Sequence, residues 1–260
     1  MDEGMRLIVL AAGQGTRLRP LTDDRPKCLV ELGGRPLLEW QIATAREAGI
    51  DDIVVIGGYK IDHLKKYDVK IIENPKFATT NMVRTLFCAQ NLFEGGFIMS
   101  YGDIVYSPAV LKHVLADEHA IAVTVDKQWR SYWERRLEDP LSDAETLKID
   151  VQGNLFEVGQ KPQSYADVQA QYIGLVAFRE AGVKQLNATY ANVLAEDAVG
   201  KNPFGGKRNL DMLYMTDLLQ GMIKNGVPLH ALPIDGGWVE VDSVSDLTLA
   251  EKLLTEGRLG

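Results

Sequence analysis

Glycine and basic residues follow an apolar run close to the start of the chain. The run, residues 6–10, predicts a buried strand. Gly13 and Gly15 then allow the backbone to turn tightly and to approach a ligand closely, so that successive N–H groups point at phosphate oxygens. Arg17 and Lys27 add charge-assisted donors. The segment therefore predicts a loop that binds the phosphates of a nucleoside triphosphate.

Two commoner phosphate loops are excluded. A dinucleotide fingerprint requires a third glycine where Leu18 stands, and no acidic residue follows at the expected distance in a later strand. The Gly-x-x-x-x-Gly-Lys-Ser/Thr pattern of a P-loop does not occur in the sequence. The segment is therefore a phosphate loop of another kind.

Three carboxylates have the spacing of a cation site. Asp103 follows Tyr101 and Gly102 at the end of a predicted parallel strand, where it would face the cleft beside the phosphate loop. Glu240 and Asp242 lie two positions apart on a short strand, so both project from one face. Mg²⁺ prefers carboxylate and phosphate oxygens, which makes these residues candidate metal ligands. Two alternatives remain: a turn aspartate after glycine, and an acidic charge at the start of the last helix.

Composition limits the class of protein. The chain has 260 residues, of which 46% are hydrophobic, and this suits one α/β domain or one domain with a lobe. A net charge of −8 argues against a nucleic-acid partner and against an anionic membrane surface. Cys28 and Cys88 are expected to be reduced thiols, with no zinc or disulfide framework. No apolar stretch approaches the roughly 20 residues of a membrane span, so we expect a cytoplasmic protein.

Apolar runs alternate with helical patterns in the first half of the chain. The runs are 7–11, 53–57, 69–73 and 97–101. This alternation predicts a Rossmann-like α/β fold, with a mostly parallel, mixed sheet flanked by helices. Helices are expected at 36–49, 80–92, 180–195 and 210–224, and strands around 146–158 and 172–178 are expected to form a small antiparallel extension on the acceptor side. We expect one domain over 1–260. Within it, residues 1–126 would form a nucleotide-binding half, residues 127–242 a half that binds a second substrate, the acceptor, and residues 243–260 a C-terminal helix.

Residues 10–27 resemble the signature L-A-A-G-x-G-T-R-L-x-P-L-T-x-x-x-P-K of the nucleotidyltransferases that make activated sugars and activated alcohols. Hexose-1-phosphate members of that family usually carry Trp-x-Asp-x-Gly where this chain has Trp238, Glu240 and Asp242. They also carry a glutamate where this chain has Gln160. The first departure resembles the choline-phosphate cytidylyltransferase branch, and the second counts against a hexose acceptor.

The resemblance implies roles for individual residues. Arg17 and Lys27 would be catalytic, and Lys161, in the family's Glu-Lys-Pro element, would contact the acceptor phosphate. Asn81 and Thr85 match a segment of the choline-phosphate branch that contacts the pyrimidine or ribose, although an asparagine at a helix start is also a common cap. The full set expected to bind the nucleotide is Leu10, Ala11, Ala12, Gly13, Gly15, Thr16, Asn81, Thr85, Tyr101 and Gly102.

An aromatic and acidic segment follows residue 126. Trp129, Tyr132 and Trp133, with Asp143 and Glu145 nearby, suit a box for the ammonium group of an acceptor, although such rings also serve as packing residues. Family position adds three further acceptor candidates, which are Tyr172, Gly174 and Asp217.

These features together predict a Mg²⁺-dependent enzyme that transfers CMP from CTP to phosphocholine, 2-aminoethylphosphonate or a similar acceptor and releases pyrophosphate. No general base is expected, because the acceptor is already ionised. The alternatives are a sugar-1-phosphate uridylyl- or thymidylyltransferase and a catalytically silent nucleotide-binding regulatory subunit. A glycosyltransferase is disfavoured because the chain has Gly-Asp where an Asp-x-Asp motif is expected. A homodimer is consistent with the family resemblance.

Overall fold

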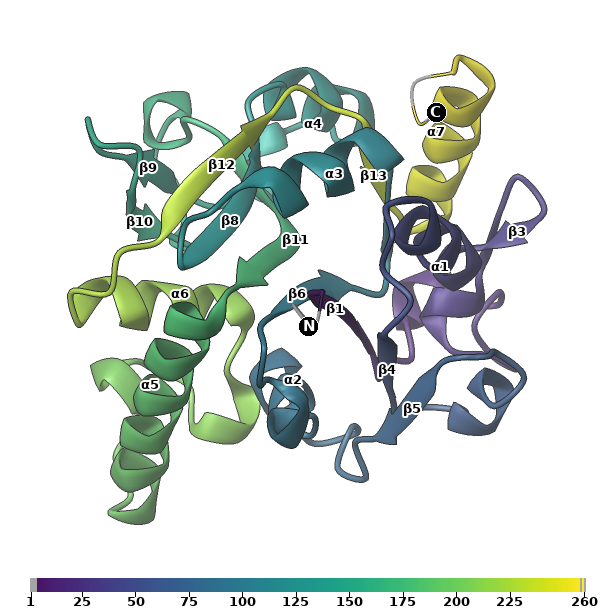
Figure 1. Ribbon diagram of the computed structural model, residues 1–260. Coiled ribbons are helices and arrows are strands. Elements are labelled where there is room, and N and C mark those ends of the chain that lie inside the picture. Colours follow the sequence, from purple (N-terminus) through teal and green to yellow (C-terminus); the bar gives the residue numbers. More distant parts are fainter. Residues whose placement is uncertain (1–3, 258, 260) are drawn as a thin grey trace.

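The computed structural model describes residues 4–257 and 259, in which helices cover both faces of a central sheet (Figure 1). The strands of this sheet, in the order in which they lie side by side, are β12 (His230–Ile234), β8 (Ile121–Asp126), β11 (Gln171–Phe178), β6 (Phe97–Tyr101), β1 (Arg6–Ala11), β4 (Ile53–Gly57) and β5 (Lys70–Glu73). All neighbouring pairs are parallel except those that β11 makes with β6 and β8. The predicted mostly parallel, mixed α/β sheet is confirmed.

Each face of the sheet packs against its own set of helices. One apolar core contains side chains from α1 (Leu37–Glu47), α3 (Pro108–Ala116), α4 (Trp129–Arg136) and α7 (Val244–Thr255). The other contains side chains from α2 (Met82–Phe87), α5 (Glu180–Ala198) and α6 (Met215–Lys224). Within β1, Leu7 and Val9 enter the first core while Ile8 and Leu10 enter the second. This two-residue period explains why the strand is apolar throughout.

Three small antiparallel pairs surround the sheet. They are β2 (Glu31–Leu32) with β3 (Arg35–Pro36), β7 (Ile104–Tyr106) with β13 (Trp238–Glu240), and β9 (Leu147–Ile149) with β10 (Leu155–Val158). The β7 and β13 pair matters for the site, because its register places Glu240 opposite Ile104. The backbone N–H of Val241 then donates to the carbonyl of Asp103 at 2.9 Å. The pairing therefore brings the C-terminal carboxylates beside Asp103.

The sequence-based placement of one strand was wrong. Residues 172–178 do not belong to a small extension; they lie in β11, between β6 and β8 in the central sheet. Nearly all of β11 is buried, so its pattern resembles that of a parallel core strand and gives no sign of its direction. Two helices are also shorter than expected: α2 ends at Phe87 before a 3₁₀ turn, and the helix expected from 210 begins only at Met215.

The central sheet crosses the boundary expected at residue 126. Strands β11 and β12 come from the 127–242 segment, yet they lie in the same sheet as β1, β4, β5 and β6. The structure does not describe residues 1–3 of the first expected unit or residues 258 and 260 of the last. None of the helices in the described part of the chain combines the length and the apolar character that a membrane span requires.

Gly174 is expected to be a stability determinant of β11. Its φ is +83°, and a Cβ added there would lie 2.5 Å from Cδ2 of the Tyr101 ring. Gly174→Ala should therefore lower the free energy of unfolding by about 3 kcal/mol, through left-handed strain and overpacking together. Urea denaturation measures this change. Gly95→Ala is the matched control, since Gly95 has φ +82° but open space around its Cβ, and it should cost only about 1 kcal/mol.

Candidate active site

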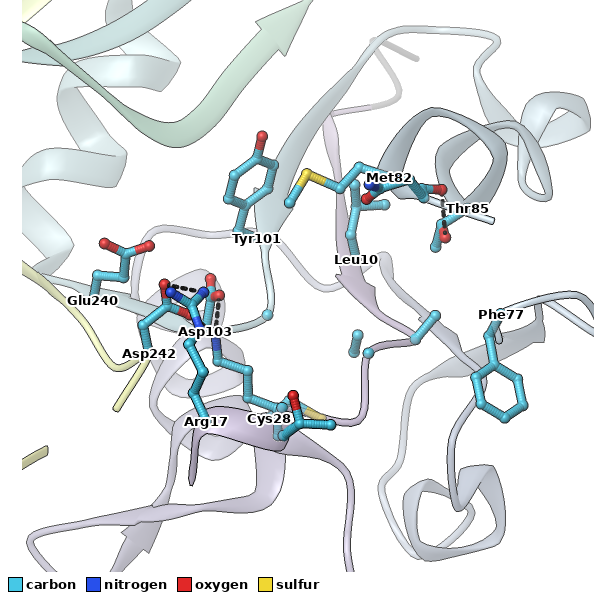
Figure 2. Close-up of a pocket in the computed structure, with 18 of the residues that line it drawn as sticks. Leu10, Arg17, Cys28, Phe77, Met82, Thr85, Tyr101, Asp103, Glu240 and Asp242 are labelled. Carbon is cyan, nitrogen blue, oxygen red and sulfur yellow. Dashed lines mark hydrogen bonds and ion pairs between the residues drawn. The ribbon is translucent and has the colours of Figure 1, made fainter. Parts of the chain in front are cut away.

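A cavity of about 350 Å³ opens where β1 and β6 end, beside the glycine-rich loop. Figure 2 shows Asp103, Glu240 and Asp242 grouped on one side of this cavity, with Phe77 and Met82 on the other. The predicted residues that line it are Leu10, Ala11, Ala12, Gly13, Gly15, Thr16, Arg17, Lys27, Asn81, Thr85, Tyr101, Gly102, Asp103, Glu240 and Asp242. The structure thus brings the expected nucleotide-binding and metal-binding residues into one place.

Two glycines allow the backbone to close around this cavity. Gly15 has φ +73°, and a Cβ there would lie 2.8 Å from the Lys27 side chain. A Cβ on Gly102 would lie 2.7 Å from the carbonyl oxygen of Leu10. The Thr22 hydroxyl donates to the Gly15 carbonyl at 2.8 Å and ties the loop back on itself. The loop therefore holds its shape without a ligand and leaves Lys27 close against it.

Lys27 lies between two of the expected metal ligands. Its side chain is only 15% exposed, and its Nζ donates to Asp103 Oδ2 at 2.5 Å and also pairs with Asp242 Oδ1. Arg17 Nη2 pairs with the other oxygen of Asp242 at 2.7 Å. Burial disfavours the charge on Lys27, but the two carboxylates outweigh it and raise the pKa of Lys27 above its ordinary value. Lys27 is therefore a cation throughout the neutral range.

The carboxylates fit a hard divalent cation. Asp103, Glu240 and Asp242 each offer an oxygen, and these atoms lie within 4.8 Å of one another. Asp103 Oδ1 is buried and has no hydrogen-bond partner among the residues that the structure describes, which leaves a charged oxygen free to coordinate an ion. Burial raises the pKa of Glu240 to about 7, and the nearby Asp242 and Asp103 add to the rise against the effect of Arg136. Such a crowded set of carboxylates is suited to Mg²⁺.

The start of α2 forms a further wall of the cavity. Asn81 is the N-cap of this helix, and its Oδ1 accepts from the Met82 N–H at 2.9 Å, as the capping alternative predicted. Thr85 donates to the Asn81 carbonyl at 3.1 Å and accepts from Asn74 at 3.0 Å. Contact of these two side chains with a nucleotide stays a prediction.

Four residues that line the cavity were not predicted from the sequence. They lie next to motif positions or in a loop without periodicity, and they are Cys28, Phe77, Thr80 and Met82.

The aromatic segment is buried packing and not an open box. Trp129, Tyr132 and Trp133 are 4%, 9% and 4% exposed, and they lie on α4 outside the cavity lining. The Arg136 guanidinium lies 5.4 Å from the centre of the Tyr132 ring and 5.0 Å from that of Trp133. The expected box for a ligand's ammonium group is therefore corrected, because the chain's own cation covers these ring faces.

The acidic acceptor candidates share a second region. Asp143 accepts from Trp133 Nε1 at 3.1 Å, and Asp217 pairs with Arg208 at 2.8 Å. Glu145 keeps contact with solvent, but the chain around its carboxyl displaces much of the water. This desolvation is the larger cause, and repulsion from Asp217 and Asp143 adds to it. Together they raise the pKa of Glu145 to about 7. Asp143 and Asp217 thus lie within electrostatic reach of Glu145.

Two tyrosines connect the cavity to this acidic region. Tyr101 lines the cavity, and Tyr172 meets its ring edge-on with a centroid distance of 5.7 Å. Gly174 leaves the space that the Tyr101 ring fills. Burial raises the pKa of Tyr172, and the charges of Glu145 and Asp103 both add to the rise. Tyr172 therefore lies within electrostatic reach of Asp103 on one side and of Glu145 on the other.

Lys161 lies outside the lining of the cavity. Its Nζ donates to the carbonyl oxygens of Leu141 at 2.5 Å and Ser142 at 2.7 Å. These contacts place the ammonium beside the loop that carries Asp143 and Glu145. Contact of Lys161 with an acceptor phosphate stays a prediction.

Comparison with known proteins agrees with this geometry. Residues 7–162 match the family model described as a MobA-like NTP transferase domain. CTP:phosphoglutamine cytidylyltransferase of Campylobacter jejuni is 39% identical over 254 residues, which cover 94% of this chain and 98% of that protein. Choline-phosphate cytidylyltransferase of Streptococcus pneumoniae is 39% identical over 106 residues, 39% of this chain and 46% of that protein.

A solved structure of CTP:phosphocholine cytidylyltransferase from Streptococcus pneumoniae has the same fold. Its TM-score is 0.72 at 22% identity, and the match covers 96% of this chain and 99% of that one. At this identity the likeness establishes the fold alone.

Proposed function

Because this chain belongs to the MobA-like NTP transferase domain family, we propose that it transfers CMP from CTP to a small acceptor bearing a phosphate or phosphonate group, with release of pyrophosphate. The observation that carries this proposal is one cavity lined by a glycine-rich loop, two cations and three carboxylates. The relative of nearly equal length that is named for CTP and phosphoglutamine supports the choice of nucleotide.

The proposed chemistry is one substitution at phosphorus. An acceptor oxygen forms a bond to the α-phosphorus of CTP, the bond from that phosphorus to the bridging oxygen of the β-phosphate breaks, and pyrophosphate leaves. The acceptor is an anion at neutral pH, so no residue has to remove a proton. The work of the protein is to position two anions against each other and to neutralise their charge.

Residues of the cavity divide this work. Backbone N–H groups of the loop at Gly13 and Gly15 and the cations Arg17 and Lys27 would hold the triphosphate. Asp103, Glu240 and Asp242 would hold Mg²⁺, which when bound supplies positive charge to the phosphate oxygens.

The acceptor would lie towards the acidic region. Its amine would face Glu145, Asp143 and Asp217, and its phosphate would be neutralised in part by Lys161. An acceptor with a positively charged nitrogen, whether a protonated amine or a quaternary ammonium, is therefore favoured over a hexose phosphate, which carries no positive charge. Phosphocholine, 2-aminoethylphosphonate and phosphoglutamine all meet this requirement.

Pyrophosphate release in a grid of substrates tests the proposal. CTP, UTP, dTTP, ATP and GTP are each combined with phosphocholine, 2-aminoethylphosphonate, phosphoglutamine, glucose 1-phosphate or no acceptor, with and without Mg²⁺. We expect release only with CTP, an amine-bearing acceptor and Mg²⁺. Turnover confined to glucose 1-phosphate with UTP or dTTP would replace the proposal by a sugar nucleotidyltransferase, and a silent grid would leave a nucleotide-binding regulatory subunit.

Glu145 should make acceptor binding depend on pH. Its carboxyl is neutral below about pH 7 and charged above it, so the KM for an amine-bearing acceptor should fall as pH rises from 6 to 8. Glu145→Gln should raise this KM about tenfold at pH 8 and have little effect at pH 6, because it removes the charge that pairs with the amine. Steady-state kinetics, measured over a range of acceptor concentrations at each pH, test this change.

Two controls isolate the carboxylate of Glu145. The acceptor phosphate itself titrates near pH 6, so the ratio of KM values between variant and wild type is the quantity to follow. Glu157→Gln removes a carboxylate that pairs with Lys148 at 3.1 Å on the β9 and β10 pair, and it should leave the ratio at one. A Glu145→Gln ratio that does not change with pH would contradict the assignment.

A further inference from the structure

Arg136 is a buried cation beside the carboxylate cluster. It is the last residue of α4, and its side chain is 4% exposed. Nη1 pairs with Glu240 Oε2 at 2.7 Å, and Nε pairs with Asp246 Oδ1 at 2.9 Å. Arg136 does not belong to the cavity lining, whereas Glu240 does. The guanidinium therefore contacts a carboxylate of the cavity from outside the cavity lining.

Asp246 extends this contact to a second carboxylate of the cavity. Its side chain is 6% exposed, and Oδ2 accepts from the backbone N–H of Ser243 at 2.9 Å and from that of Asp242 at 3.2 Å. The Ser243 hydroxyl completes a capping box with Asp246 at the start of α7. Asp246 is thus bonded on one side to the guanidinium and on the other to the backbone that carries the Asp242 side chain.

Tyr132 fixes the backbone at the same point. Its hydroxyl accepts from the Glu240 N–H at 3.0 Å and donates to the Glu240 carbonyl at 3.3 Å. The Tyr132 ring also packs on the guanidinium of Arg136. Helix α4 therefore holds Glu240 through both its side chain and its backbone.

Stability alone is a weak reason for this arrangement. Removing an arginine and two carboxylates from water is costly, and apolar residues of similar volume often stabilise a fold equally well. What the ionic arrangement supplies in addition is direction, since a guanidinium fixes the plane of each carboxylate that it contacts. Here the fixed carboxylate, Glu240, and the fixed backbone, Asp242, both belong to the candidate metal site.

We propose that Arg136 is a positioning residue, which through Glu240 and Asp246 sets the geometry of the carboxylates that bind the metal and nucleotide. The proposal rests on the proposed function in one respect, namely that Asp103, Glu240 and Asp242 bind a divalent cation together with CTP. It gives α4 a role at the metal site in place of an aromatic box for the acceptor.

Metal affinity, measured without turnover, tests this role. Mn²⁺ is titrated into the protein with CTP and no acceptor, beside a protein-free titration of the same CTP that accounts for Mn²⁺ held by free nucleotide, and free Mn²⁺ is followed by electron paramagnetic resonance. Arg136→Met should weaken Mn²⁺ binding at least tenfold. Arg136→Lys should give an intermediate loss, because an ammonium can pair with one carboxylate but cannot bridge two in fixed planes. In turnover, the concentration of Mg²⁺ for half-maximal rate should rise by the same factor, with a smaller change in kcat at saturating Mg²⁺.

Matched variants separate positioning from general stability. Arg6→Met removes another largely buried arginine, which pairs with Asp52 at 2.8 Å and donates to the Leu92 carbonyl beyond the cavity lining, and it should leave Mn²⁺ affinity unchanged. If Arg136→Met fails to fold, Tyr132→Phe and Asp246→Asn make the same test with smaller changes in volume. Each should weaken Mn²⁺ binding severalfold.

Each result decides the question. Wild-type Mn²⁺ affinity in folded Arg136→Met, or in both of the smaller variants, would overturn the positioning role. A wild-type protein that binds Mn²⁺ with CTP but turns over no acceptor would contradict the proposed reaction. The positioning role would then still be decided by the Mn²⁺ titration of the Arg136 variants. A wild-type protein that binds no Mn²⁺ with CTP would overturn both.

Discussion

Asp103→Asn should lower the rate of pyrophosphate release about 10³-fold while the protein stays folded. Asp103 uses Oδ2 to pair with Lys27, and no group in the described part of the chain hydrogen-bonds to its buried Oδ1, so negative charge faces the cavity. The amide keeps the shape but removes the charge, and losing one such electrostatic contact costs about 10²–10³ in rate. A loss at the upper end of this range is expected here because the pairing of Lys27 is weakened at the same time.

Steady-state kinetics and far-UV circular dichroism measure this prediction. Asp62→Asn is the control, because Asp62 is an exposed carboxylate that pairs with Lys65 at 2.6 Å outside the cavity lining. That variant should retain wild-type turnover. A folded Asp103→Asn protein within tenfold of the wild-type rate would contradict the role given to this residue.

Lys27→Met should change turnover and Mn²⁺ binding in opposite directions. Turnover should fall by 10²-fold or more, because a buried cation beside the triphosphate is removed. Binding of Mn²⁺ in the absence of CTP should instead become tighter. The reason is that the Lys27 ammonium lies between Asp103 and Asp242, where it competes with a divalent cation for the same oxygens.

Titration of Mn²⁺ into the protein alone tests this second expectation. Lys112→Met serves as the control, since Lys112 is exposed and lies 3.7 Å from Glu47 on α1. Because the two carboxylates raise the pKa of Lys27 above that of a free lysine, the ammonium is present at about pH 8, where the titration is made because Glu240 is then largely charged. Unchanged or weaker Mn²⁺ binding would mean that the ammonium does not oppose the metal.

The local sequence was sufficient to predict which residues gather on the glycine-rich side of the cavity. Gly13, Gly15, Arg17 and Lys27 lie within one short segment that follows a strand, so their relation to a ligand depends on local backbone geometry. Asp103 could be placed as well, since side chains after parallel strands gather at one edge of the sheet. Glu240 and Asp242 were assigned to one face by the two-residue period of a strand.

The local sequence was misleading on the acceptor side. Trp129, Tyr132 and Trp133 have the composition of a ligand box, but composition does not say what covers a ring. The group that covers Tyr132 and Trp133 is Arg136, which belongs to the same helix. The direction of β11 was hidden for a related reason, because a strand buried on both faces has no alternation to read.

The amino-acid sequence alone was enough to predict the class of fold, the glycine-rich loop and the residue types that gather around it, because these depend on short-range periodicity and on local backbone freedom. Which charges meet is evident only in the folded chain. Lys27 reaches Asp103 and Asp242 across 76 and 215 positions, and Arg136 reaches Asp246 across 110. Hydrophobic periodicity records whether a residue is buried, but the partner of a buried charge is set by how distant segments pack, and that packing is what makes this a single site.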